Sequence, residues 1–538
     1  MTYSPELAPA QSPSEQPEAR GPRTYRIAEL LLILLAVVIS AGAYALVGLG
    51  VRDTVPGNVY GYTIWLAVLG LGLHVVTWWR AKYADPILVP VAILLNGLGL
   101  AMIYRIDLAK ESSTATSQLV WMTLGTVLAA LVVFFVRDHR LLRRLTYTCG
   151  LAAIVLLLLP LIPGLGTTIN GARIWIRLGP FSFQPGEIAK ILLAVFFAGY
   201  LVSFRDQLVL AGPKILGIRF PRLRDLGPII IAWVASVGIL VFQRDLGTSL
   251  LFFGLFVAML YVATNKKTWI FLGLGMFALG AVAASFMFSH VQQRIDGWLG
   301  ALTPEEYNKS PGGSYQLVQG MFGMSSGGLT GTGLGEGRPQ VVPYSESDFI
   351  YASLGEELGM VGLFAILMLY VILFERGMKI SSRVRDGFGK LLTAGLTFTI
   401  ALQVFIVIGG VTRVIPLTGL TTPFLAAGGS SLIANWIIIG LLLRISDAAR
   451  RPAEEFQTGV LTVVADDSDD PESHNRTARL GRRRDTAEDA EAPIPWGDAP
   501  ARQDSGAQQP GPRISQDDAP TTAQPPIRPT RPPGGEQR

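Results

Sequence analysis

Residues 27–50 read IAELLLILLAVVISAGAYALVGLG, and Glu29 is the only charged residue in this run. A helix needs about 20 mostly apolar residues to cross a bilayer, and this run is long enough. It begins too far into the chain and continues too long for a cleaved signal peptide, and no small-residue cleavage pattern follows it. The run therefore predicts an uncleaved membrane-spanning helix.

Eleven further apolar runs follow along the chain. Each must satisfy its own backbone hydrogen bonds in lipid, so we expect helices throughout and an all-α polytopic membrane protein with twelve spans. We treat the stretch 226–264 as two spans, because its combined length would cross the bilayer twice. The eleven runs are 59–79, 86–104, 117–136, 145–162, 187–204, 226–242, 247–264, 268–288, 350–374, 389–411 and 424–444.

The composition favours a membrane protein over several other classes. Of the 538 residues, 50% are apolar and 16% are charged, whereas soluble chains usually carry about 25% charged residues. The single Cys149 excludes an internal disulfide framework, and the four scattered His residues show no zinc-ligand spacing. A soluble enzyme, a nucleic-acid-binding protein and a secreted disulfide-rich protein therefore fit poorly, and membrane lipids are the expected surroundings.

The Lys and Arg residues predict the orientation, because short cytoplasmic loops carry an excess of them. They gather in alternate loops, for example around 137–144 and 376–390. With these loops inside, both termini lie in the cytoplasm. The segments 163–186 and 289–349 then lie outside the cell.

A polar segment leads into the run at 187–204. Arg173 stands next to Trp175, which suits either an anionic lipid headgroup or an ordinary anchor at the membrane interface. Glu187 and Lys190 are three residues apart, so they share one helical face. They suit an ion pair that holds two spans together as well as direct contact with a substrate.

A second polar motif, Gln243-Arg244-Asp245, lies between two apolar runs. The position of Asp245 favours an N-cap for the helix that follows. Arg244 has a charge suited to a pyrophosphate, and that role stays open.

The long segment 289–349 is rich in glycine and contains a third motif. Its Gly-x-Gly repeats lack the Lys-Ser/Thr of a phosphate-binding loop, so we expect tight turns or close backbone approach instead. We interpret His290 as structural or interfacial. Asp348 enters the next span between Ser347 and Phe349, where apolar surroundings could raise its pKa and suit it to general-base work. Spacing alone favours a helix N-cap for Asp348.

A fourth motif of small residues covers 416–435 and includes Ser430. Small residues allow close helix packing, and they also occur where a broken helix lines a cavity. Packing is the favoured interpretation for most of them.

In this order, Asn170-Gly171-Ala172-Arg173, the pair Glu187 and Lys190, and Ser347-Asp348-Phe349 resemble motifs of the SEDS family (shape, elongation, division, sporulation). The sequence looks most like the RodA branch, with the FtsW branch as the close alternative. The resemblance implies a ten-span core, preceded here by two extra spans. The expected divisions are a disordered N-terminal tail (1–22), two extra spans (23–85), the core (86–446) with its extracellular loop (289–349), and a disordered tail rich in Pro, Asp and Arg (447–538).

The resemblance also implies an activity, that of a peptidoglycan glycosyltransferase acting on lipid II in cell elongation. A sugar 4-hydroxyl attacks the anomeric carbon of a lipid-linked donor, undecaprenyl pyrophosphate leaves, and the linkage inverts. The family's essential acidic position falls on Asp348, which makes it the expected general base and reverses the N-cap preference. The expected substrate-binding residues are Arg173, Glu187, Lys190, Gln243, Arg244, Ser347 and Ser430.

The implied partner is a class B penicillin-binding protein, the transpeptidase that crosslinks the glycan. A divalent cation, Mg or Mn, at the pyrophosphate is left open. The alternatives are a division-type polymerase similar to FtsW, a flippase of lipid-linked precursors, and a scaffold. A flippase needs charges accessible from both leaflets, whereas the candidate residues gather at the outer loops, which favours the enzyme.

Overall fold

The computed structural model describes residues 22–451, apart from short gaps at 170–171, 180, 210–213, 216–217, 220–229, 232–233, 236–237, 240–241 and 310–312. The predicted tails therefore lie almost wholly outside the described residues. Their inner boundaries move slightly, because the first helix already includes Pro22 and the last continues to Arg450.

Ten helices among the described residues are long and apolar enough to cross a membrane. They coincide with ten of the twelve predicted runs and confirm a polytopic helical fold. They are α1 (Pro22–Arg52), α2 (Val59–Arg80), α3 (Leu88–Lys110), α4 (Thr114–Phe135), α7 (Pro185–Val209), α9 (Leu246–Thr264), α10 (Thr268–Met287), α14 (Ile350–Arg383), α15 (Gly387–Val411) and α16 (Gly429–Arg450).

The other two predicted runs differ. Residues 145–162 form the apolar helix α6 (Thr146–Leu158), which follows the short helix α5 (Leu141–Arg144) and ends in the 3₁₀ turn η1 (Leu159–Leu161). Pro160 lies in that turn and has no backbone N–H to continue an α-helix. The run at 226–242 falls mostly outside the described residues.

Two small sheets add to the all-α expectation. The antiparallel strands β1 (Gly166–Ile169), β2 (Ala172–Leu178) and β3 (Phe181–Phe183) pair in that order, and Ile176 lies opposite both Gly166 and Phe183. The alternation of apolar and polar residues in this stretch is typical of a strand. The strands β4 (Lys214–Ile215) and β5 (Ile218–Arg219) form a second pair.

The segment 289–349, predicted as an extracellular loop, has secondary structure of its own. It contains the helices α11 (Ser289–Leu299), α12 (Pro304–Tyr307) and α13 (Tyr315–Gly327), and the 3₁₀ turn η3 (Pro339–Val341). The helix α14 breaks at Gly359, which has φ 68°. The glycine-rich part of the segment pairs with α14 at this break. Beside the break, the N–H of Met360 donates to the Gly328 carbonyl oxygen at 3.0 Å.

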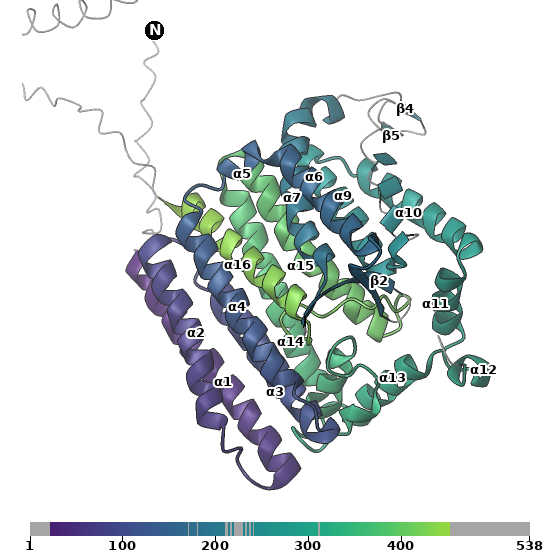
Figure 1. Ribbon diagram of the computed structural model, residues 1–538. Helices are drawn as coiled ribbons and strands as arrows, with labels where there is room; N and C mark the ends of the chain where they lie inside the picture. The colour runs from purple at the N-terminus through teal and green to yellow at the C-terminus, as the bar shows by residue number, and fades with distance from the viewer. Residues whose placement is uncertain are drawn as a thin grey trace, which may run out of the picture. The chain divides into compact units, whose positions relative to one another are not determined.

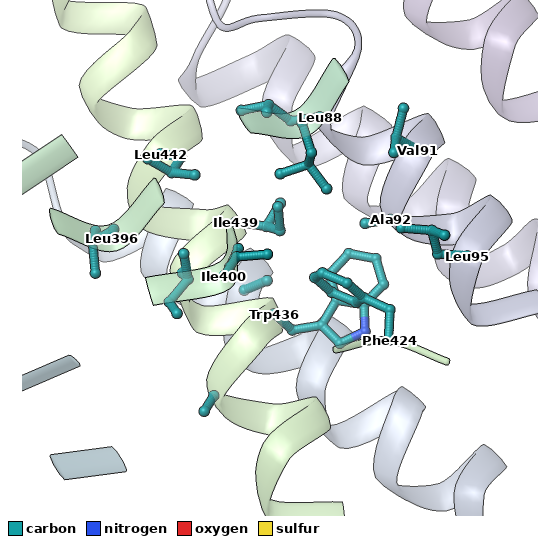
Figure 2. Close-up of a cluster of buried hydrophobic side chains, with 14 of the residues drawn as sticks. Leu88, Val91, Ala92, Leu95, Leu396, Ile400, Phe424, Trp436, Ile439 and Leu442 are labelled. Atoms are coloured by element: carbon teal, nitrogen blue, oxygen red, sulfur yellow. The ribbon is translucent and has the colours of Figure 1, made fainter. Parts of the chain in front are cut away.

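The packed core lies where α3, α15 and α16 meet (Figure 2). Trp436 of α16 is fully buried, and its ring meets Phe424 edge to face with 5.8 Å between the centroids. The indole N–H of Trp436 donates to Asn96 Oδ1 at 3.1 Å, so the one polar atom of this ring is satisfied. The packed side chains fix these helices relative to one another.

Two helices precede the core, and Figure 1 shows α1 and α2 side by side along one edge of the bundle, against α3 and α4. A buried ion pair joins Arg26 to Glu29 at 2.5 Å, and His74 Nδ1 of α2 lies 2.8 Å from the same carboxylate. Arg26 also donates to the Ala84 carbonyl oxygen at 2.5 Å. These contacts attach the first helix both to the second and to the start of the core.

Candidate functional site

Asp348 lies in a short segment that neighbouring elements hold from several sides. Lys110 at the end of α3 pairs with Glu346 at 2.7 Å, and the N–H of Ala427 donates to the Glu346 carbonyl oxygen at 2.8 Å. The next residue, Phe349, is fully buried. No side chain caps the start of α14, so Asp348 is not the N-cap that spacing alone favoured.

A cavity of about 710 Å³ opens beside the Asp348 carboxylate. It lies at the helix end that carries the segment 289–349, between the starts of α9 and α13, the helix α11 and the residues after α15. Its polar and charged lining residues are Arg244, His290, Gln293, Arg294, Ser314, Gln316, Tyr344, Asp348 and Thr418.

Sequence reasoning gave α11 no part in the site, and it interpreted His290 only as structural or interfacial. His290, Gln293 and Arg294 line the cavity together, and their spacing of three and four residues was the available signal of a shared helical face. Arg294 is held there, because its Nη1 donates to the Leu417 carbonyl oxygen at 3.2 Å. The indole N–H of Trp298 donates to the Arg413 carbonyl oxygen at 3.0 Å and attaches the same helix to the turn after α15.

Burial raises the pKa of Asp348 to about 6. The positive charge of Arg294 opposes this effect, while the negative charges of Glu346 and Asp245 add to it. A carboxylate with this pKa is ionised at neutral pH and still basic enough to accept a proton from a substrate hydroxyl.

The motif at 243–245 contributes one residue to the cavity. Arg244 has φ 56° and lines the cavity, whereas Asp245 caps α9 by accepting from the Thr248 N–H at 2.9 Å, as predicted. Gln243 is buried and donates to the Leu157 carbonyl oxygen, so its amide fastens this turn to α6. The left-handed backbone at Arg244 turns the chain sharply just before the helix.

Glu187 and Lys190 form the predicted pair on one face of α7, with 2.5 Å between Lys190 Nζ and Glu187 Oε2. Both side chains are buried. Lys190 also donates to Gln403 Oε1 at 2.9 Å and to Asn435 Oδ1 at 3.3 Å. Three protein acceptors therefore surround the ammonium group, and the pair joins α7 to α15 and α16.

The other predicted substrate-binding residues are Ser347, Arg173 and Ser430, and only Ser347 is next to Asp348 in the chain. The Ser347 hydroxyl favours the ionised carboxylate of Asp348. Arg173 lies on β2 and donates to the Ile162 carbonyl oxygen at 3.3 Å, and Ser430 is buried at the start of α16. Neither Arg173 nor Ser430 lines the cavity, and their substrate contacts stay predictions.

A second cavity, also about 710 Å³, is almost wholly apolar and lies between α9, α10 and α15. Phe253, Phe277 and Leu402 are among its lining residues. The two cavities share four lining residues, so the apolar groove lies directly beside the polar cavity. The shared residues are Leu246, Val291, Trp298 and Thr418.

The described residues contain no group of three or more His, Cys, Asp or Glu side chains that could hold a metal ion. Magnesium usually takes one or two carboxylates and completes its shell with water and substrate phosphates. A cation at this site would therefore take most of its ligands from the substrate and from water.

The helices and the cavity define a multi-pass membrane protein with a half-buried carboxylate of raised pKa in a cavity that two arginines also line. A model of the family comprising FtsW, RodA and SpoVE, described as "Cell cycle protein", matches residues 86–451. The chain therefore belongs to this family, which confirms the resemblance seen in the motifs.

Named relatives place the chain within the family. It is 48% identical over 436 residues to the peptidoglycan glycosyltransferase RodA of Mycobacterium tuberculosis, covering 80% of this chain and 92% of the relative. It is 33% identical over 382 residues to the stage V sporulation protein E of Bacillus subtilis, covering 68% and 98%. The identity to the RodA protein is the higher of the two.

Among solved structures, one described as "Structural coordination of polymerization and crosslinking by a peptidoglycan synthase complex" has a similar fold. The TM-score is 0.55 and the identity 26%, over 68% of this chain and 98% of that chain.

Proposed function

We propose that this chain is a RodA-type peptidoglycan glycosyltransferase that polymerises lipid II in cell elongation and shape maintenance. The observation that carries the proposal is the placement of Asp348 in a cavity with Arg244 and Arg294, next to an apolar groove. A substrate that is half sugar pyrophosphate and half lipid chain needs these two environments side by side. The names of the RodA relatives support the same reaction.

In the proposed reaction, Asp348 accepts the proton of the acceptor sugar's 4-hydroxyl as that oxygen bonds to the donor's anomeric carbon. The bond from that carbon to the pyrophosphate breaks at the same time, and attack from the opposite face inverts the linkage, as in inverting glycosidases. The electron pair leaves with the undecaprenyl pyrophosphate. Arg244 and Arg294 stabilise the negative charge that develops there.

The apolar groove accepts the prenyl chain. Its lining comes mainly from α9, α10 and α15, and it shares four lining residues with the polar cavity. A chain lying in the groove would bring its pyrophosphate to Leu246 and Trp298, which line both cavities. Burial of the chain would then place the reacting sugar near Asp348 at little further entropic cost.

Glu187 and Lys190 do not line the cavity, and their proposed contribution to the site is indirect. Burial raises the pKa of Asp245, the hydrogen bonds from Thr248 and Gly247 lower it, and the negative charge of Glu187 raises it. The negative charge of Asp245 in turn raises the pKa of Asp348. The α7 pair thus lies within electrostatic range of the residue that caps α9. Its proposed role is to fix the α9 start, and with it Arg244.

The proposed orientation follows the basic residues. The loops at 137–144 and 376–390 lie at the helix end opposite the cavity, and their basic residues support a cytoplasmic location for that end and for both termini. The cavity then faces outward, where glycan strands are built. All its lining residues lie at this one end, which supports an enzyme over a flippase.

A class B penicillin-binding protein is the proposed partner. The structure described for a peptidoglycan synthase complex supports an assembly of this kind. A divalent cation at the pyrophosphate is a further proposal, with its ligands drawn from phosphate oxygens and water.

The test is polymerisation of purified lipid II by the purified chain in detergent, with and without the co-purified transpeptidase. Glycan strands in either sample support the proposal. Absence of strands in both, together with lipid II transfer across vesicles that contain the chain, would support a flippase instead.

A further inference from the structure

The end of α1 contacts the glycine-rich loop that precedes Asp348 (residues 328–343), and the contact is between backbone atoms. A Cβ atom added to Gly50 would lie 2.4 Å from the Leu334 carbonyl oxygen and 3.0 Å from the Gly335 Cα. A Cβ added to Gly335 would lie 2.8 Å from the Gly50 Cα. Glycine at both positions is therefore a condition of this contact.

The other side of the same loop is fastened to the first turns of α14. The Gly335 N–H donates to Glu357 Oε2 at 2.9 Å, and the Arg338 N–H donates to Glu356 Oε1 at 2.7 Å. Arg105 of α3 pairs with Glu357 at 2.9 Å. The loop is thus clamped between α1 on one side and α3 and α14 on the other.

This contact comes from a part of the chain outside the family match, which begins at residue 86. The helix α1 is itself well anchored. The Tyr44 ring stacks on Tyr62 of α2 and Tyr104 of α3, with 4.3 Å between centroids in each pair. An anchored helix can hold a loop in place, whereas a mobile one cannot.

We propose that α1, through Gly50, positions the glycine-rich loop and thereby the Asp348 segment for glycosyl transfer. The inference rests on the proposed catalytic role of Asp348. It makes Gly50 and Gly335 positioning residues, and it gives the N-terminal helix pair a function in the reaction.

A side chain at residue 50 must push Leu334 and Gly335 away, which weakens the hydrogen bonds from the loop to Glu356 and Glu357. The loop then opens more often, and its amides exchange faster with solvent. Turnover falls because Asp348 loses its fixed position. The KM for lipid II changes little, because α9, α10 and α15 form the apolar groove without the loop.

The test compares Gly50→Leu and the milder Gly50→Ala with Gly42→Leu in the full-length protein. Gly42 is the matched control, because it lies on the same helix and an added Cβ would meet nothing within 4 Å. The readouts are hydrogen–deuterium exchange of the loop peptides over 328–343 and the kcat and KM of lipid II polymerisation. We expect exchange about tenfold faster and kcat about tenfold lower in Gly50→Leu, smaller changes of the same kind in Gly50→Ala, and none in Gly42→Leu.

Unchanged exchange and turnover in both Gly50 variants would overturn the inference. So would a loss of turnover without faster loop exchange, or equal losses in Gly42→Leu. If Gly50→Leu does not fold, Gly50→Ala decides by the same criteria. Asp348→Asn separates this inference from the proposed function, because it should abolish turnover without changing loop exchange. An active Asp348→Asn variant would refute the general-base role of Asp348. The exchange measurements on the Gly50 variants would still decide whether α1 holds the loop in place.

Discussion

Asp348 and Arg294 face one cavity from different parts of the segment between α10 and α14, and the guanidinium partly offsets the effect of burial on the carboxylate. The resulting pKa of Asp348 is about 6. Without the arginine, the pKa would be higher, and less of the carboxylate would be ionised at neutral pH. The pair therefore serves two purposes in the proposed reaction, because Arg294 also meets the leaving pyrophosphate.

The wild-type rate should fall as the pH drops through about 6. Asp348 must be ionised to accept a proton, and well below its pKa the ionised fraction decreases about tenfold per pH unit. Initial rates of lipid II polymerisation between pH 4.5 and 8 would show this fall as the acid limb of the pH–rate profile. Enzyme returned to pH 7.5 after each exposure should regain full activity, and a rate that stays flat down to pH 5 would refute the assignment.

Replacing Arg294 with Gln should shift that acid limb to higher pH and lower kcat by about 10²–10³-fold, the usual cost of losing one group that stabilises transition-state charge. Arg294→Lys should keep part of the activity. Arg52→Gln provides the control, because Arg52 is an exposed arginine at the same end of the helices. A normal pH profile in Arg294→Gln would show that the two charges do not interact.

Breaking the buried pair on α7 should destabilise the protein. Lys190→Met leaves Glu187 buried without its cation, which typically costs about 3–5 kcal/mol, whereas Glu187→Gln/Lys190→Met removes both charges and should recover most of the loss. Thermal melting in detergent measures both. Lys379→Met breaks a solvent-exposed pair with Glu375 and should cost less than about 1 kcal/mol. Equal melting temperatures for the single α7 variant and this control would contradict the structural role.

Filling the apolar groove should weaken binding of the lipid chain selectively. Ala281→Trp places a large ring among the groove residues of α10, so the KM for full-length lipid II should rise about tenfold while a short-chain analogue is unaffected. Gly275→Trp changes the same helix at a position with open space and outside the groove lining. An equal effect of both substitutions, or of either lipid length, would argue against the groove as the chain site.

Much of the fold could be predicted because a membrane-spanning helix can be recognised from a local run of about 20 apolar residues. Ten of the twelve apolar runs coincide with helices long and apolar enough to cross a membrane, and the three-residue spacing of Glu187 and Lys190 correctly placed the two side chains on one face. The run at 145–162 formed a shorter helix because Pro160 ends it. The strands around Ile176 were not predicted, although the alternation of apolar and polar residues there is typical of a strand.

The site was harder to predict because tertiary packing assembles it. Arg294 became visible as a partner of Asp348 only when α11 was placed against the residues after α15. The buried position of Gln243 depends on α6, far away in the sequence, where the Leu157 carbonyl oxygen accepts from its amide. The role of Asp348 was suggested by resemblance, whereas spacing pointed to a cap that the structure does not show.

The most direct measurement is lipid II polymerisation by Asp348→Asn, a substitution that keeps the shape of the side chain and removes its ability to accept a proton. Glu305→Gln, at an exposed carboxylate on α12, is the matched control. The account predicts at least about a 10²-fold loss of rate in Asp348→Asn, with normal membrane insertion and melting temperature, and full activity in Glu305→Gln. Glycan strands formed at the wild-type rate by Asp348→Asn would contradict it.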